Sequence, residues 1–350
     1  MAKNPSYTLE REIKYTKKLQ ALCAELPPLC SEFFRGIADQ TAILTRYNYA
    51  VDLRIFFRYL SEVKFDGQRK ITEFLLSDLE QITLDDLERY MEFLNLYETP
   101  DGRPVKNRER AKARKVASLR SFFKYFFRKQ KLSNNIAALL ETPKIHDKPI
   151  LRLEADEAAN LLDCVDSLSL STERQQVYNQ HTQIRDSAII TLFLGTGIRV
   201  SELVGLNVED LDFSANAFTV TRKGGNRVIL YFSEEVAQAL KAYLEIRKEI
   251  TTLPGQESAL FLSLQRRRIT VRSVENIVKK YTNSAVPLKN ISPHKLRSTF
   301  GTQMYQETGD IYLVADVLGH KDVNTTTKHY AAQADARRRQ AARVIKLREP

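Results

Sequence analysis

The stretch Ala188-Ile-Ile-Thr-Leu-Phe-Leu-Gly-Thr-Gly-Ile-Arg-Val-Ser-Glu-Leu203 joins an apolar run to a short segment that contains two glycines and two charged residues. Gly195 and Gly197 interrupt the apolar run, and glycine tolerates backbone angles that other residues avoid. We therefore predict that a buried helix ends here and that another helix begins at once. Arg199 and Glu202 are three residues apart and would share one face of the second helix. Taken alone, this spacing is typical of a surface ion pair, which contributes little to stability.

A second segment, Ser292-Pro-His-Lys-Leu-Arg297, has the pattern of a helix start. Ser292 suits the N-cap position, and Pro293 suits the first turn. His294 and Arg297 are three residues apart and would lie on one face. The start of a helix favours anions through its dipole and its free amide groups. The segment therefore predicts either a phosphate-binding helix end or a capped helix with incidental polar residues.

A third segment runs from Leu318-Gly-His320 to Tyr330. Gly319 follows an apolar helical pattern and is predicted to end that helix in the left-handed conformation. His320 comes directly after this end. Asn324 resembles an N-cap, and it places Tyr330 a little over one helical turn later. Taken singly, such a histidine or tyrosine is more often structural than catalytic.

The three segments together offer two arginines, two histidines and one tyrosine. Arginine neutralises phosphate oxygens in a fixed bidentate geometry. Histidine transfers protons near neutral pH, and tyrosine can supply an oxygen nucleophile. The set suits attack on a phosphodiester by a tyrosine, with no metal and no cofactor. No carboxylate cluster, cysteine pair or glycine-rich nucleotide loop in the sequence competes with it.

The whole chain has 350 residues, a hydrophobic content of 43% and a formal net charge of +11. These values indicate two ordinary domains. The charge favours a polyanionic partner, either nucleic acid or an anionic membrane surface, and it equally fits a soluble protein that is merely basic. The odd number of cysteines, without a close pair, argues against disulfides or a zinc site, so Cys23, Cys30 and Cys164 are predicted to be buried thiols. The polar N-terminus and the short apolar runs favour a soluble, cytoplasmic protein.

The first 140 residues are predicted to be helical. Apolar and aromatic residues recur at helical spacing between Thr45 and Ser61, and again over residues 84–96. Phe56, Phe57 and Tyr59 are predicted to lie in the core rather than to form a base-stacking platform.

A strongly basic segment extends from Asp101 to Lys131, with 12 lysines or arginines against two acidic residues, a net charge of +10. Apolar residues at helical spacing near its end predict a packing face, with the basic residues on the other side. A solvated face is the usual outcome for such a run. Because the charges have nearly all one sign, we favour contact with DNA. The expected DNA contacts are Arg46, Lys106, Arg110, Lys112, Arg114, Lys115, Arg120 and Lys124.

Residues 142–150 contain two prolines and no helical period, and we place an inter-domain linker there. Two strands are predicted over 217–222 and 227–232, joined through Lys223-Gly-Gly-Asn226, with a further strand near 208–213. Helices are predicted over residues 154–163, 183–194, 234–250, 271–281, 293–306 and 311–318. The fold class is therefore mainly α with a small antiparallel β-sheet.

The ordered set of motifs resembles the tyrosine recombinase (phage integrase) superfamily, and within it Xer-type site-specific recombinases. Thr196-Gly-Ile-Arg-x-Ser-Glu-Leu203, a Lys-Gly hairpin, His294-x-Leu-Arg-Ser-Thr-Phe300, Leu318-Gly-His320 and Tyr330 follow the family's order. Residues 45–53 are similar to the family's core-binding domain, and the N-terminus is similar to that of Xer proteins of the single-recombinase type. The resemblance implies a helical, SAM-like core-binding bundle over residues 1–141. It implies a mixed α/β catalytic domain with a C-terminal tail over residues 151–350.

The resemblance also implies the chemistry. The catalytic residues it implies are Arg199, Lys223, His294, Arg297, His320 and Tyr330. In that scheme the tyrosine forms a 3′-phosphotyrosyl link and the arginines stabilise the charged phosphate. The lysine protonates the leaving 5′-oxygen, the first histidine acts as acid and base, and the second hydrogen-bonds the phosphate. Glu202 orients an arginine or histidine, and neither ATP nor a metal is required.

The hairpin departs from the family's usual Gly-Lys-Gly form, because it reads Arg222-Lys-Gly-Gly-Asn-Arg227. Lys223 is the better match, since it directly precedes the turn glycines. Arg222 and Arg227 remain alternatives for the side chain that enters the site.

The implied partners are double-stranded DNA with a specific recombination site, three further copies of the chain in a tetramer on two duplexes, and a DNA translocase or accessory factor. The basic tail over 331–348 would dock on a neighbouring protomer or remain unanchored. The role favoured is the resolution of chromosome dimers before chromosome partition and cell division. The alternatives are an integrase of a phage or conjugative element, a type IB topoisomerase and a non-catalytic DNA-binding regulator.

Overall fold

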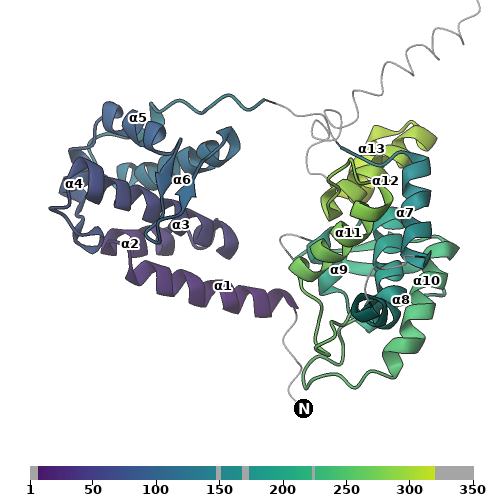
Figure 1. The fold of residues 1–350 in the computed structure, drawn as a ribbon. Helices are drawn as coiled ribbons and strands as arrows, with labels where there is room; N and C mark the ends of the chain where they lie inside the picture. The colour runs from purple at the N-terminus through teal and green to yellow at the C-terminus, as the bar shows by residue number, and fades with distance from the viewer. Residues whose placement is uncertain (1–6, 147–150, 168–172, 223–224, 320–350) are drawn as a thin grey trace, which may run out of the picture. The chain divides into compact units, whose positions relative to one another are not determined.

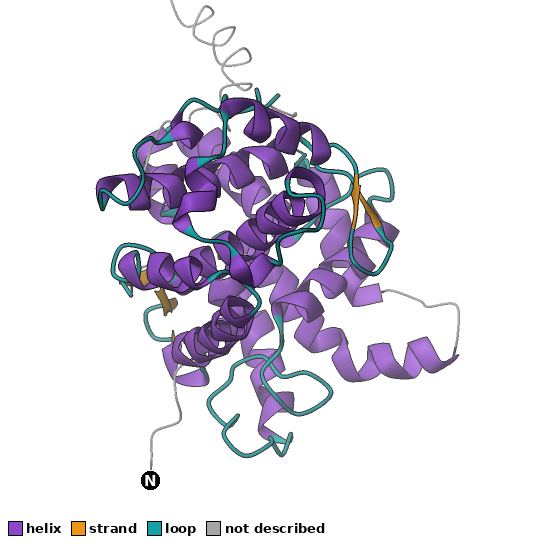
Figure 2. Ribbon diagram, turned by 90° about the vertical axis from the view of Figure 1, so that its left-hand side faces the viewer, coloured by secondary structure: helices purple, strands orange, loops and turns teal. Residues whose placement is uncertain are grey.

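A computed structural model describes residues 7–146, 151–167, 173–222 and 225–319, and within these ranges the side chains of 173–181 are not described. The chain divides into two compact units, Met1–Asp147 and Lys148–Pro350 (Figure 1). The division falls within residues 142–150, where the sequence predicts a linker. Both units are built mainly from helices, and each has a small antiparallel sheet (Figure 2). The predicted fold class is confirmed.

The first unit is a helical bundle. Its elements are α1 (Tyr7–Ala24), α2 (Pro28–Gly36), α3 (Ile43–Tyr59), a π-helical turn (Leu60–Lys64), a 3₁₀ turn (Ile71–Glu73), α4 (Leu76–Glu80), α5 (Leu84–Phe93), β1 (Tyr97–Glu98), β2 (Pro104–Val105), α6 (Glu109–Arg128) and a 3₁₀ turn (Ile136–Ala138).

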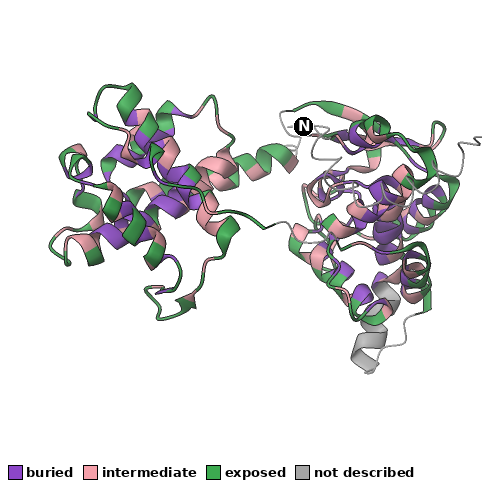
Figure 3. Ribbon diagram, turned by 90° about the horizontal axis from the view of Figure 1, so that it is seen from above, coloured by how far each residue is buried: buried purple, intermediate pink, exposed green. Residues whose placement is uncertain are grey.

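An aromatic core holds the first unit together. Figure 3 shows that buried residues lie in the interior of this unit. Phe56 and Phe57 of α3 are fully buried, and Tyr59 nearly so, which confirms their prediction as core residues. The ring of Phe57 meets that of Phe122 on α6 edge-on, with 5.9 Å between the centroids. Edge-to-face pairs of this kind add to the gain from burying the rings. The apolar face of α6 predicted from its spacing is therefore the face that packs.

The second unit combines helices with a three-stranded sheet. Its elements are α7 (Ala155–Ser167), α8 (Glu173–Thr196), α9 (Val200–Gly205), a 3₁₀ turn (Val208–Asp210), β3 (Leu211–Asp212), β4 (Ala217–Thr221), β5 (Arg227–Tyr231), α10 (Glu234–Lys248), α11 (Val271–Ala285), α12 (Pro293–Thr308) and α13 (Ile311–Leu318).

Helix α8 is the centre of this unit, because it contacts α7, α10 and α12. Residues 188–190, 192 and 193 are completely buried. A helical segment that is apolar on all sides must be enclosed by others, which is what the neighbours of α8 do. The sheet has the order β3-β4-β5 and is antiparallel, with Ala217 opposite Tyr231 and Thr221 opposite Arg227. This hairpin confirms the pair of strands predicted from the sequence.

Two expectations need correction. The strand predicted near residues 208–213 consists of two residues, since Val208–Asp210 form a 3₁₀ turn whose Asp210 carboxylate accepts the Asn207 N–H at 2.8 Å. Of the three cysteines, Cys30 is fully buried, whereas Cys23 and Cys164 are half-buried; all are free thiols. In the described residues, no helix has both the length and the apolar character needed to cross a membrane.

Candidate active site

The site begins where α8 ends. Gly197 has a φ of +61°, and a Cβ there would lie 2.4 Å from Cδ1 of Phe300 and 2.9 Å from Cδ2 of Leu318. A side chain at this position would therefore meet both a strained backbone and occupied space. The reversal lets Arg199 occupy the N-cap position of α9, one residue before the helix, whereas the sequence predicts that it lies within the helix.

Glu202 holds Arg199 by both its backbone and its side chain. The carboxylate accepts the Arg199 backbone N–H on Oε2 at 3.0 Å and its Nη1 on Oε1 at 2.7 Å. Glu202 is 8% exposed, so this is not the surface pair that the spacing alone suggests. A buried carboxylate that accepts two hydrogen bonds from one residue fixes the direction of that guanidinium.

Arg297 lies on the inward face of α12 and is 5% exposed. Its Nη1 donates to the carbonyl oxygen of Gly197 at 2.5 Å, and its Nη2 donates to the carbonyl oxygen of Leu318. His294, one turn earlier, is exposed at the start of the same helix. Ser292 occupies the N-cap position as predicted, but its side chain makes no capping hydrogen bond.

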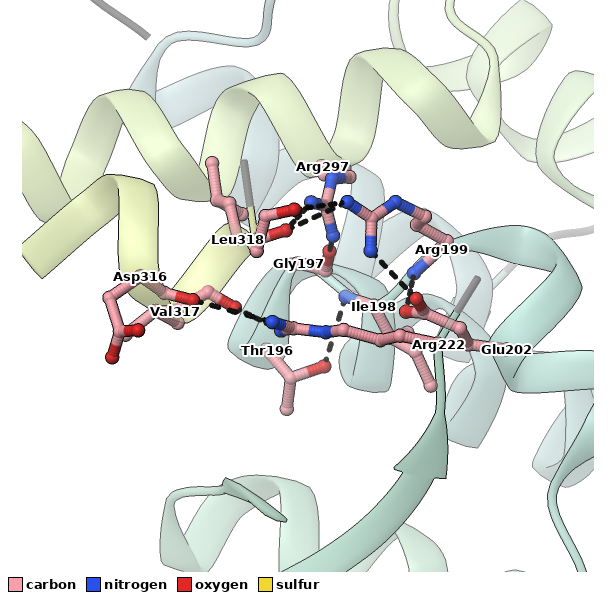
Figure 4. A network of polar contacts seen from close by, with 11 residues as sticks. Thr196, Gly197, Ile198, Arg199, Glu202, Arg222, Arg297, Asp316, Val317 and Leu318 are labelled. Atoms are coloured by element: carbon pink, nitrogen blue, oxygen red, sulfur yellow. Dashed lines mark hydrogen bonds and ion pairs between the residues drawn. The ribbon is translucent and has the colours of Figure 1, made fainter. Parts of the chain in front are cut away.

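The carboxyl end of α13 brings the two arginines together (Figure 4). The helix ends at Gly319, which has φ 60° and ψ 50° as the sequence predicts. Nη2 of Arg199 donates to the carbonyl oxygens of Leu318 at 3.0 Å and Gly319 at 2.9 Å, and Arg297 shares the first of these acceptors. The last carbonyls of a helix lack internal partners and form its negative end, so they attract cations.

A third arginine joins them from the hairpin. Nη2 of Arg222 donates to the carbonyl oxygen of Val317 at 2.7 Å, and its Nη1 lies 3.5 Å from that of Asp316 (Figure 4). Arg227 instead has a side chain that is 71% exposed and lies 3.8 Å from the Asp210 carboxylate. Of the hairpin alternatives, Arg222 enters the cluster and Arg227 does not, while Lys223 lies outside the described residues.

Among the described residues the cluster carries an excess of positive charge, since the charges of three guanidinium groups are opposed by two carboxylates, those of Glu202 and Asp316. Burial lowers the pKa of the Arg222 guanidinium from its usual value, Glu202 opposes the shift, and Arg199 adds to it. Arginine remains charged at neutral pH despite such shifts. A bound anion such as a phosphate would balance the excess, and guanidinium groups suit it geometrically. His320, Tyr330 and the tail over 331–348 lie outside the described residues.

The structure corrects one of the predicted DNA contacts in the first unit. Lys115 is 4% exposed, with Nζ 3.2 Å from Oδ1 of Asn107 and 3.5 Å from Oδ1 of Asp52. Arg114 is half-exposed and also pairs with the buried Asp52. Lys115 therefore belongs to the core of the bundle, because its position on α6 falls on the packing face rather than the solvated one.

The other predicted DNA contacts differ in their exposure and in their hydrogen bonds. Lys112 donates to Oδ1 of Asn95, and Arg120 donates to the carbonyl oxygen of Leu140 at 2.5 Å. Arg46 is half-buried. The exposed members of the predicted set that carry no bond to a described residue are Lys106, Arg110 and Lys124.

Comparison with known proteins agrees with this geometry. Residues 152–337 match the model of the phage integrase family. The chain is 35% identical over 313 residues to tyrosine recombinase XerC of Caldanaerobacter subterraneus, covering 86% of this chain and 82% of the relative. It is 29% identical over 345 residues to tyrosine recombinase XerS of Lactococcus lactis, covering 91% and 94%.

Solved structures show the same fold. The XerH site-specific recombinase bound to a palindromic difH substrate matches with a TM-score of 0.65 and 19% identity, over 87% of this chain and 81% of that one. The Tn1549 transposon integrase in complex with circular intermediate DNA matches with a TM-score of 0.62 and 19% identity, over 89% and 99%. The chain therefore belongs to the phage integrase family, and within it to the Xer-like tyrosine recombinases, which are DNA strand-exchange enzymes.

Proposed function

We propose that this enzyme cuts and rejoins double-stranded DNA at a specific site, with Tyr330 as the nucleophile. The phenolic oxygen attacks the scissile phosphorus, a 3′-phosphotyrosyl bond forms, and the bond to the 5′-oxygen breaks. The phenol loses its proton, and the leaving 5′-oxygen gains one. The 5′-hydroxyl of a partner duplex then attacks the link, reseals the strand and releases the tyrosine. Each step exchanges one phosphodiester for another, so no external energy source is needed.

The observation that supports this proposal is the pairing of Arg199 and Arg297 on one carbonyl oxygen, that of Leu318. Two guanidinium groups that share one acceptor lie within the span of a single phosphate. Charge that develops on the non-bridging oxygens would be stabilised by donors already held in place, which is the most effective form of electrostatic catalysis. The two hydrogen bonds that Arg199 donates to the Glu202 carboxylate support the role of Glu202 in orienting this guanidinium.

The remaining roles follow the family pattern. We propose that Lys223 protonates the leaving oxygen, that His294 acts as acid and base, and that His320 hydrogen-bonds the phosphate. Lys106, Arg110 and Lys124, which are exposed around α6, would contact the DNA backbone. Strand exchange between two duplexes would require a tetramer, in which the tail over 331–348 docks on a neighbour.

For the biological role we propose the resolution of chromosome dimers in the cytoplasm, assisted by a translocase or accessory factor. Relatives named XerC and XerS cover most of this chain at 29–35% identity, which favours this role over that of a mobile-element integrase. Activity on two copies of one chromosomal site, without a second recombinase, would support it. Activity only on the paired ends of a mobile element would contradict it.

Replacing Tyr330 by phenylalanine will abolish the covalent protein–DNA adduct, because the phenolic oxygen is the atom that forms the bond. The substrate is a nicked duplex built on the sequence that the protein selects from a random library, and the adduct is measured on denaturing gels. Tyr312→Phe, which removes the hydroxyl of an exposed tyrosine on α13, is the matched control and retains the adduct. An adduct of normal yield from Tyr330→Phe would refute the assignment.

Replacing Arg110 and Lys124 together by alanine will weaken binding to random-sequence duplex DNA and reduce its salt dependence. Each lost phosphate contact lowers the slope of log K against log salt by about 1, because fewer counterions are released. The measurement is fluorescence anisotropy between 50 and 200 mM salt. Lys70→Ala removes a charge from an exposed site elsewhere in the same unit and serves as control. An unchanged slope in the double variant would place the DNA elsewhere.

A further inference from the structure

Arg222 lies at a junction between the hairpin and α13. Its backbone closes the hairpin, since its N–H donates to the carbonyl oxygen of Asn226 at 2.8 Å and its own carbonyl oxygen accepts from Gly225 at 3.1 Å. Its side chain leaves the hairpin and reaches the carbonyl oxygens at the end of α13. One residue therefore ties the turn after β4 to the last turn of a helix almost a hundred residues later in the sequence.

The guanidinium of Arg222 lies directly against Gly319. A Cβ at Gly319 would come within 2.1 Å of Nη1 and 2.4 Å of Cζ of Arg222. The left-handed conformation already favours glycine here, and the close approach of the arginine gives a second, independent reason. The absence of a side chain at the end of α13 therefore leaves the space that the Arg222 guanidinium occupies.

The three arginines occupy consecutive carbonyl oxygens of the chain. Arg222 takes those of residues 316 and 317, Arg199 and Arg297 share that of 318, and Arg199 also takes that of 319. The acceptor that orients the catalytic pair is therefore adjacent to the one that Arg222 holds. A shift of the residue 317 carbonyl would be passed on to that of residue 318, because their two planar peptide units are consecutive and share the Cα of Leu318.

We propose that Arg222 is a positioning residue for the reaction. It holds the carboxyl end of α13 in place and thereby sets the guanidinium directions of Arg199 and Arg297. This inference rests on the proposed function for its catalytic consequence, but the positioning itself can be measured without DNA. A misplacement of about 1 Å in a reacting geometry is enough to cost roughly a hundredfold in rate.

Hydrogen exchange of the free protein tests the positioning directly. In Arg222→Ala, the peptide covering residues 311–319 should exchange about tenfold to a hundredfold faster than in the wild type, since charge-assisted hydrogen bonds to the helix end are lost. Arg227→Ala removes the same charge from an exposed place in the same hairpin and should leave this peptide unchanged. Equal exchange in Arg222→Ala and wild type would overturn the inference, whether or not the protein cleaves DNA.

Cleavage then separates positioning from direct contact. At saturating protein on the nicked substrate, Arg222→Ala should form adduct about tenfold to a hundredfold more slowly, with DNA affinity within about threefold of the wild type. Arg222→Lys, which can still donate to one carbonyl, should recover part of the rate and of the exchange protection. Slow cleavage with unchanged exchange would instead assign Arg222 to direct phosphate contact. Failure of the wild type to form any adduct would refute the proposed function and leave the exchange result standing.

A double-mutant cycle tests the contact between the two residues. Gly319→Ala should slow cleavage both by straining the backbone and by displacing the Arg222 side chain. In the Arg222→Ala background the second effect disappears, so the loss caused by Gly319→Ala should be smaller than in the wild type. Losses that multiply independently would show that the two residues do not act through one another, and would overturn this part of the inference.

Discussion

Replacing Arg297 by alanine will slow formation of the covalent adduct by about 10²–10³-fold, the cost of losing one preorganised donor to a developing oxyanion. The guanidinium is almost completely buried and bonds the carbonyl oxygens of both Gly197 and Leu318. Its loss also removes the hydrogen bonds from α12 to the backbone at the ends of α8 and α13, so the direction of Arg199 is disturbed as well. The measurement is single-turnover cleavage of the nicked substrate at saturating protein.

A control variant must separate a lower cleavage rate from a lower stability of the fold. Arg247 is a good match, because it also donates its guanidinium to backbone carbonyls in the same unit, those of Glu257, Ala259 and Leu260. Arg247→Ala should lower the melting temperature and leave the cleavage rate of the folded protein within about threefold of the wild type. If the two variants lose cleavage equally, Arg297 acts as a structural residue and the catalytic assignment is wrong.

Replacing Asp52 by alanine will destabilise the first unit by about 3–5 kcal/mol, the usual cost of leaving a buried partner charge uncompensated. The Asp52 carboxylate is buried and accepts from Arg114 and from the hydroxyl of Ser118 at 3.3 Å, with Lys115 close by. Such a loss is a large fraction of the total stability of an ordinary domain. Urea unfolding, followed by circular dichroism, measures it.

Two comparisons sharpen this test. Asp39→Ala removes the same side chain from an exposed turn of the same unit and should change stability by less than about 0.5 kcal/mol. Burial raises the pKa of Asp52, with Lys115 and Arg114 opposing, and burial also lowers the pKa of Lys115. Both shifts reflect the desolvation of the pair, so Asp52→Leu combined with Lys115→Met should recover most of the lost stability. A double variant as unstable as Asp52→Ala would contradict this account.

Much of the second unit follows from local sequence. The glycines at 197 and 319 mark helix ends because few other residues adopt their backbone angles. The end at Gly319 lies where the sequence predicts it, whereas α8 continues through Gly195 to Thr196, two residues beyond its predicted end. The helix of residues 311–318 has the predicted bounds, and the hairpin strands differ from the prediction by one residue at one end. These features depend on neighbours in the chain, so pattern and turn chemistry are enough to find them.

The basic segment shows where local pattern is insufficient. Its apolar spacing correctly predicts the packing face of α6, but Lys115 also lies on that face and is buried with it. Its partner, Asp52, is 63 positions earlier in the sequence. The sequence of one helix does not reveal a buried carboxylate elsewhere in the chain. A buried lysine in a basic segment therefore cannot be told apart from a solvent-exposed one.

The sequence by itself determined the family, the order of the helices, the hairpin and the pair of arginines on two helix starts. Tertiary structure decided which acceptors those arginines share and that Arg222, rather than Arg227, joins them from the described part of the hairpin. The shared acceptor at Leu318, the burial of Glu202 and the approach of Arg222 to Gly319 all link residues from separate elements. The physical reason is that the carbonyl groups at the end of α13 gain arginine partners only when other elements fold against them. Local patterns can predict where a helix ends, but they do not predict which basic side chains will donate hydrogen bonds to its last carbonyl oxygens.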